Sequence, residues 1–164
     1  MSEIPERVFV AANQGIPNHP RWPALVYHGV VAPDAGAIER RFEANGWPPL
    51  WRDGIFAYHH FHSAGHEALG IAGGRARVRL GGPEGVDVEV AAGDVLVLPA
   101  GTGHCRLEAS ADLLVVGAYP PGQRGDIQRA PATAAMTAAI AALPHPAGDP
   151  VEGPDGPLMR AWAG

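Results

Sequence analysis

The stretch from residue 59 to residue 67 reads His59-His60-Phe61-His62-Ser63-Ala64-Gly65-His66-Glu67. On an extended strand, side chains two residues apart point to the same side, so His60 and His62 can bind one metal ion. A turn at residues 63–65 would return Glu67, on the following strand, to a place beside them. This spacing predicts a metal site.

A second stretch reads Gly93-Asp94-Val95-Leu96-Val97-Leu98-Pro99-Ala100-Gly101-Thr102-Gly103-His104. Its glycines and proline favour a tight turn, after which His104 begins a new strand. If the two stretches face each other, His104 adds a third imidazole. The site then has three nitrogen ligands and one oxygen ligand.

The rest of the chain reads as short strands separated by turns rich in glycine and proline. The strictest alternation is at residues 75–80, where arginines alternate with apolar side chains. Strands are expected at 24–27, 55–62, 67–72, 75–80, 86–90, 95–98, 103–107 and 113–119, and helices at about 35–45 and 132–143. Paired prolines make 47–51 a predicted loop, and Trp162 is expected to dock on the body. The pattern predicts an all-β sandwich or barrel.

Composition narrows the class of protein. The 164 residues suit one domain, and a formal net charge of −5 with no basic cluster argues against nucleic acid or an anionic membrane as a partner. Cys105, the one cysteine, excludes an intrachain disulfide and fits a reducing compartment. The sequence has no apolar run of about 20 residues and no signal-like N-terminus, so a cytoplasmic location is expected.

Both histidine stretches match a known pair of motifs. The first motif is His-x-His, four residues, Glu, six residues and Gly, met by His60, His62, Glu67 and Gly74. The second is Gly, five residues, Pro, one residue, Gly, two residues and His, met by Gly93, Pro99, Gly101 and His104. With these motifs the chain resembles the cupins. The resemblance implies a jelly-roll barrel with one short helix before it and one after it, and metal binding by His60, His62, Glu67 and His104.

Segments outside the motifs are similar to the YjlB-type cupins. They are Ile16-Pro17-Asn18, Asn45-Gly46-Trp47-Pro48-Pro49, His66-Glu67-Ala68-Leu69-Gly70, the run from Leu98 to Cys105, and Gly117-Ala118-Tyr119-Pro120-Pro121-Gly122-Gln123. The resemblance implies one cupin domain over 1–164, with an N-terminal segment to about 54, a barrel core at about 55–119 and a C-terminal helix and tail. It also implies a homodimer, but it supplies no substrate.

Some residues keep alternative roles. His66 stands beside Glu67 and is the competing fourth ligand, because adjacent strand residues face opposite ways. The six-residue spacing to Gly74 favours Glu67, and a bulge would reverse that choice. His66, Tyr58 and Glu108 are candidate catalytic residues; Glu108 stands where the family motif often has Asn. Phe56 is expected in the barrel core.

Three imidazoles and a carboxylate suit Fe, Mn, Ni, Co or Zn as the divalent cofactor. The ligand set has no thiolate, which disfavours a structural zinc site. The first hypothesis is a metal-dependent enzyme acting on a small polar or acidic molecule, of the dioxygenase, isomerase or decarboxylase class. The second is a non-catalytic module that binds or senses a metabolite or the metal. A pocket closed by Phe56 or Trp51 would favour the second.

Overall fold

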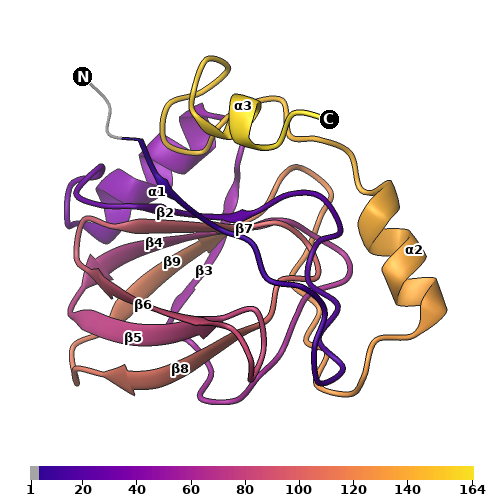
Figure 1. Cartoon of the computed structure of the whole chain (residues 1–164). Helices are drawn as coiled ribbons and strands as arrows, with labels where there is room; N and C mark the ends of the chain where they lie inside the picture. Colours follow the sequence, from indigo (N-terminus) through magenta and orange to yellow (C-terminus); the bar gives the residue numbers. More distant parts are fainter. Residues whose placement is uncertain (1–3) are drawn as a thin grey trace.

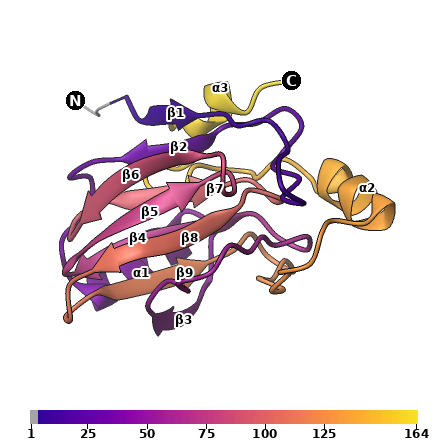
Figure 2. The ribbon, with the colours of Figure 1, turned by 60° about the horizontal axis from the view of Figure 1, so that its bottom comes forward.

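Two antiparallel sheets face each other in the computed structural model, which describes residues 4–164 (Figures 1 and 2). The larger sheet has the strand order β1-β2-β7-β4-β9-β3, and the smaller has the order β6-β5-β8. The strands are β1 (Glu6–Val8), β2 (Ala24–Tyr27), β3 (Pro49–Asp53), β4 (Glu67–Gly73), β5 (Arg75–Leu80), β6 (Val86–Ala91), β7 (Val95–Leu98), β8 (His104–Ala109) and β9 (Leu114–Ala118). This architecture confirms the predicted all-β jelly-roll barrel.

Apolar side chains from both sheets fill the space between them. Leu69 and Leu96 project from the larger sheet, and Val78, Leu80 and Val90 meet them from the smaller one. In β5 these apolar positions alternate with Arg75, Arg77 and Arg79 on the outer face, as the sequence predicts. The barrel interior is therefore dry over most of its length.

The outer face of the larger sheet is covered by helix α1 (Ala35–Ala44) and by the C-terminal tail. Asp34 caps α1 by accepting a hydrogen bond from the Ala37 amide at 2.8 Å. Ile38 and Phe42 of α1 lie against Gly70 of β4, where a Cβ atom would come within 2.5 Å of Ile38. The absence of a side chain at Gly70 thus lets the helix approach the sheet.

The remaining helices follow the barrel. Helix α2 spans Ala134–Ala142, close to the predicted helix, and helix α3 is a short element at Leu158–Ala161 that the sequence did not predict. Trp162 is fully buried, stacks on Trp22 and donates from its indole nitrogen to the Pro23 carbonyl at 2.8 Å. The predicted docking of Trp162 is confirmed. Within residues 4–164, the structure contains no helix with the length and apolarity needed to cross a membrane.

Two expectations for the strands were wrong. Residues 55–62 do not form a strand; only isolated bridges are present there, between His60 and His104 and between Phe61 and Gln128. Conversely, part of the predicted loop at 47–51 is the start of β3, an edge strand whose first residue is Pro49. Proline is tolerated in that place because its missing N–H breaks no central ladder. With β1 and β2, three strands of the larger sheet precede residue 55.

Candidate metal centre

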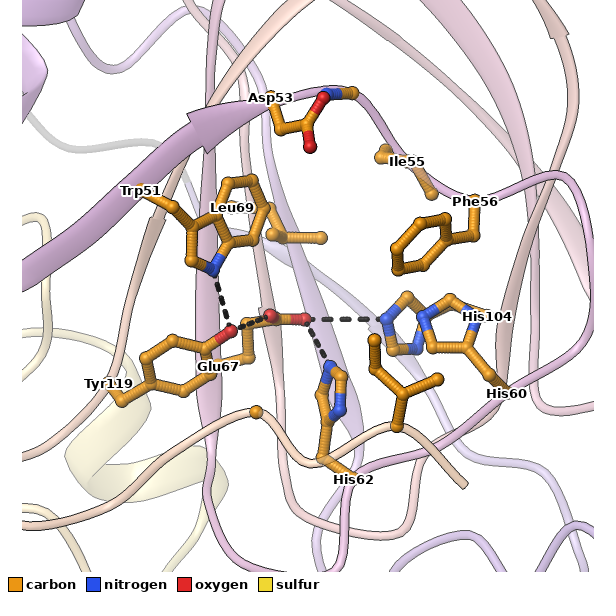
Figure 3. Close-up of a pocket in the computed structure, with 13 residues that line it drawn as sticks. Trp51, Asp53, Ile55, Phe56, His60, His62, Glu67, Leu69, His104 and Tyr119 are labelled. Carbon is orange, nitrogen blue, oxygen red and sulfur yellow. Dashed lines mark hydrogen bonds and ion pairs between the residues drawn. The ribbon is translucent and has the colours of Figure 1, made fainter. Parts of the chain in front are cut away.

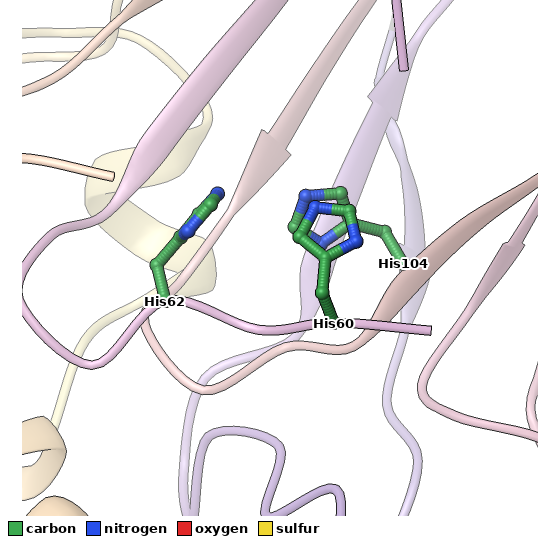
Figure 4. Close-up of side chains that lie close together, drawn as sticks. All are labelled: His60, His62 and His104. Atoms are coloured by element: carbon green, nitrogen blue, oxygen red, sulfur yellow. The ribbon is translucent and has the colours of Figure 1, made fainter. Parts of the chain in front are cut away.

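Three histidine rings meet at one end of the barrel. The backbones of His60 and His104 pair, with N···O distances of 3.3 and 3.0 Å, which sets the segment before β4 against the start of β8. One ring nitrogen from each of His60, His62 and His104 lies within 4.8 Å of the other two (Figure 4). Three imidazoles at this spacing can hold a metal ion.

Glu67, the first residue of β4, brings a carboxylate to the same place (Figure 3). Its Oε1 lies 3.1 Å from Nε2 of His62 and 3.3 Å from Nε2 of His104. The Glu67 residue is only 2% exposed. A buried carboxylate in contact with two imidazoles completes a set of three nitrogens and one oxygen, the donors that divalent transition metals accept.

Backbone carbonyls fix the orientation of each ring. Nδ1 of His60 contacts the Tyr58 carbonyl at 3.0 Å, Nδ1 of His62 contacts the Asp126 carbonyl at 2.5 Å, and Nδ1 of His104 contacts the Thr102 carbonyl at 3.1 Å. A carbonyl oxygen only accepts hydrogen bonds, so each Nδ1 carries the hydrogen. In the neutral rings, the lone pair is therefore on Nε2.

His60, His62 and Glu67 differ in their protonation. Burial and the neighbouring His104 lower the pKa of His60 to about 3, so its ring is neutral at physiological pH. Burial lowers the pKa of His62, but the Glu67 carboxylate outweighs burial and raises that pKa above its ordinary value. For Glu67, burial by itself raises the pKa. The charge of His62 and the hydrogen bonds from His104 and His62 outweigh burial, so the pKa of Glu67 lies well below its ordinary value. In the metal-free protein a proton on His62 thus balances Glu67.

A tyrosine and a tryptophan, which the sequence did not indicate as site residues, support Glu67 from the other side. Tyr119 donates from its hydroxyl to Oε2 of Glu67 at 2.5 Å and accepts from Nε1 of Trp51 at 2.9 Å. The Trp51 ring lies over Gly117, where a Cβ atom would come within 2.0 Å of the indole. Trp51 of β3 pairs with Gly117 of β9, so the register of these two strands brings the Trp51 indole to the Tyr119 hydroxyl.

The turn between His62 and Glu67 is held by Asp126. Its carboxylate accepts from the Ser63 amide at 2.9 Å, the Ala64 amide at 2.8 Å and the Ser63 hydroxyl at 2.5 Å. The carbonyl of Asp126 also accepts from His62. One residue of the segment after β9 therefore fixes both the turn and a ring at the site.

A cavity of about 220 Å³ opens onto this group. Its walls are mostly apolar. The expectation that Phe56 lies in the barrel core was wrong, because Phe56 is 43% exposed and stands at the rim of the cavity (Figure 3). The lining residues are Trp51, Asp53, Gly54, Ile55, Phe56, His60, His62, Glu67, Leu69, His104, Tyr119, Gly125 and Ile127. A small molecule can therefore reach the histidine cluster.

Comparison with known proteins gives one relative in sequence. No family model matches the chain. The protein YjlB of Bacillus subtilis (strain 168) is 38% identical over 149 residues, which cover 90% of each chain. This chain belongs to the YjlB family. The name of that relative states no activity, so family membership alone assigns none.

Solved structures show weaker likeness to this YjlB-family chain. An RmlC from Streptococcus suis in complex with dTDP-D-xylose has a TM-score of 0.38 and 13% identity, over 73% of this chain and 71% of its own. Streptomyces albus HEPD, with 2-hydroxyethylphosphonate and Fe(II) bound, has a TM-score of 0.32 and 15% identity, over 87% of this chain and 28% of its own. With TM-scores below 0.5, these likenesses say nothing about this chain's activity.

Within the YjlB-family fold, His66 lies away from the cavity. Its Nδ1 accepts from the Ala100 amide at 2.9 Å, its Nε2 contacts the Pro144 carbonyl at 3.2 Å, and its ring packs near Trp22 and Trp162. The structure places Glu67, not His66, with the three histidines. The structure does not bring His66 to the three histidines, because His66, which immediately precedes β4, projects to the opposite side from Glu67.

Tyr58 and Glu108, the other catalytic candidates, also lie outside the cavity. The Tyr58 ring is covered by the Arg129 guanidinium at 3.8 Å. Glu108 pairs with Arg77 on the outer face at 3.1 Å, because a bulge in β8 shifts the register between Arg77 and Val78. The extra residue reverses the side on which Glu108 projects.

Proposed function

We propose that this protein binds one divalent transition-metal ion through His60, His62, Glu67 and His104, and acts as a metal-dependent enzyme on a small polar or acidic molecule. To hold a divalent ion, His62 would give up the proton that it shares with Glu67, the three neutral imidazoles would supply lone pairs, and Glu67 would supply one negative charge.

The observation that carries the proposal is the orientation of the three rings. Each Nδ1–H is held by a backbone carbonyl, and two of the three Nε2 atoms contact the same carboxylate oxygen. Metal-binding histidines in proteins have this arrangement, in which the second ring nitrogen donates to a fixed acceptor. Histidines that serve only packing have no need to direct two Nε2 atoms at one carboxylate oxygen.

The cavity supports an enzyme over a closed storage site. Neither Phe56 nor Trp51 closes it, and four protein ligands leave open positions on a six-coordinate ion. When bound, such an ion can polarise a substrate oxygen or activate water. The protein itself supplies a mostly apolar wall, and Tyr119 and Asp126 hold Glu67 and His62 in place.

Elemental analysis of the purified, untagged protein tests the metal site. We expect about one equivalent of a divalent transition metal per chain, with loss of the metal in His60→Ala and His104→Ala. His59→Ala is the matched control, because His59 adjoins the ligands but does not line the cavity. Circular dichroism checks that the variants remain folded. A metal-free parent that cannot be reloaded with Fe(II), Mn(II), Ni(II) or Zn(II) would contradict the proposal.

The same preparation separates an enzyme from a binding module. The metal-loaded protein is screened for turnover of small oxygen-containing compounds, with the His104→Ala variant as the blank. Metal-dependent turnover supports the enzyme. Tight ligand binding without turnover under aerobic and anaerobic conditions supports the alternative, a module that binds or senses a metabolite.

A further inference from the structure

Apart from its histidines, the charged side chains that line the cavity are acidic. Apart from the histidines, the charged lining residues in the described part of the chain are Glu67 and Asp53, and no arginine is among them. The whole sequence contains no lysine. When a divalent ion is balanced by Glu67 and by one carboxylate of a bound molecule, the remaining fixed charge in the cavity is the negative charge of Asp53.

Two arginines near the cavity, Arg52 and Arg129, have partners elsewhere. The Arg129 guanidinium lies over the Tyr58 ring at 3.8 Å. Arg52, next to Asp53 in β3, points to the other side of the strand and makes two bonds to Glu39 at 2.8 and 2.6 Å. Neither cation is available to a molecule in the cavity.

Asp53 is the last residue of β3 and lies at the rim opposite Glu67. Figure 3 shows its carboxylate pointing into the space between Trp51 and Phe56. One oxygen accepts from the Gly54 amide at 2.8 Å, and no other described group donates to this carboxylate. Two aromatic rings and a carboxylate with a free oxygen make a favourable environment for an ammonium group.

We infer that the molecule this site takes is a small amine: an oxygen group at one end binds the metal, and a protonated amino group at the other end pairs with Asp53. The inference rests on the proposed metal site and narrows its substrate class. A short apolar body between the two ends suits Ile55, Leu69 and Ile127, which line the walls between them.

Size and charge exclude other classes of ligand. A volume of about 220 Å³ lies below the roughly 300 Å³ at which pockets begin to hold drug-sized ligands, so a nucleotide-linked compound does not fit. A dicarboxylic acid can place one carboxylate on the metal. Its second carboxylate then faces Asp53 with no lysine or arginine among the lining residues to balance it, which costs binding free energy.

Calorimetric titration of the metal-loaded protein with three chain-matched compounds tests the inference. They are 4-aminobutanoate, butanoate and butanedioate, which share a metal-binding carboxylate and differ only at the far end. We expect 4-aminobutanoate to bind about fivefold more tightly than butanoate, as for a partly exposed ion pair. We expect butanedioate to bind most weakly. In Asp53→Asn the first two compounds become equal and butanedioate gains affinity.

Asp112→Asn is the matched control, since Asp112 is an exposed turn aspartate that does not line the cavity. It is expected to leave the order of the three affinities unchanged. The inference is overturned if butanedioate binds the parent at least as tightly as 4-aminobutanoate, if Asp53→Asn leaves the order unchanged, or if none of the three binds at millimolar concentration.

Elemental analysis of the same sample keeps this inference distinct from the proposed function. Protein that retains no metal but prefers 4-aminobutanoate in an Asp53-dependent way refutes the metal site and supports the role of Asp53. Protein that holds one metal ion and prefers butanedioate supports the metal site and refutes the amine.

Discussion

At the scale of single residues, Tyr119 joins the aromatic wall of the cavity to the carboxylate. Its hydroxyl has one hydrogen, which goes to Glu67, and its oxygen accepts from Trp51. Burial, with the negative charge of Glu67, raises the pKa of Tyr119 well above its ordinary value. Tyr119 is therefore a permanent donor that holds one oxygen of Glu67 and leaves the other for the histidines.

Removing that hydroxyl should loosen the metal without removing it. In Tyr119→Phe we expect metal affinity to fall about ten- to hundredfold, the usual effect of losing a group that orients a ligand. Competition with a chelator measures the affinity. Tyr58→Phe is the control, because the Tyr58 hydroxyl makes no hydrogen bond within the described residues and should leave the affinity unchanged. Equal affinities in both variants would show that Tyr119 does not orient Glu67.

Two loops form one unit at the scale of structural elements. The turn at residues 63–66 packs against the segment after β9, and at Gly65 a Cβ atom would come within 2.6 Å of the Arg124 carbonyl oxygen. Asp126 links the two loops through its carboxylate and its carbonyl. The orientation of His62 thus depends on a loop far from it in sequence.

Asp126→Ala tests that dependence, because it removes all the acceptors that hold Ser63 and Ala64. We expect a metal affinity lowered by about tenfold and faster loss of the ion, since the turn can move. Asp126→Asn keeps one carboxamide oxygen as an acceptor and should lie between the parent and Asp126→Ala. Stopped-flow transfer of the metal to a coloured chelator measures the rate. Identical rates in the three proteins would contradict the link.

The sequence predicted the strands whose conformation follows from residues adjacent in the chain. The alternation of Arg75 to Leu80 gave the bounds of β5, and the glycine and proline turns bounded β7 at Val95–Leu98. The strand expected at residues 55–62 does not form, because only isolated bridges pair this segment with other parts of the chain. β3 was missed because its prolines suggested a loop, whereas the edge of a sheet accepts Pro49.

In the candidate site, too, the residues with a local sequence signal were predicted and those without one were missed. His60, His62, Glu67 and His104 were predicted from spacing within two short stretches. Tyr119, Trp51 and Asp126 carry no local signal, because they reach the site only through the pairing of β9 with β3 and β4 and the path of the loop after β9. Glu108 was placed wrongly because spacing does not reveal a bulge.

At the scale of the whole molecule, an aromatic cluster ties the two ends of the chain to the barrel. His19 and Trp22 stack on each other, Trp22 stacks on Trp162, and His66 packs against both tryptophans. Burial, and then neighbouring charge, lowers the pKa of His19 to about 3. Burial lowers the pKa of His66 to about 4. Both rings are therefore neutral in the folded protein.

This cluster should make the fold sensitive to acid. The folded pKa values lie below the unfolded value of about 6.5, so the unfolded chain binds more protons in between. Stability is full above about pH 6.5 and falls as the pH drops toward 4. Urea unfolding of metal-free protein at several pH values measures the slope, which His66→Gln should reduce. In His28→Gln the slope should not decrease, because hydrogen bonding to Glu6 raises the pKa of His28. An unchanged slope in His66→Gln would contradict this account.

The order in which the site's parts appear along the chain bears on biosynthesis. A ribosome-bound chain ending near residue 110 already contains the four proposed ligands. It lacks Tyr119 and Asp126, which orient Glu67 and His62, and it lacks β9, which lies between β4 and β3 in the sheet. Contacts between distant parts of a chain form late. The fully oriented set of proposed ligands therefore exists only after the residues that follow β8 have been added and folded.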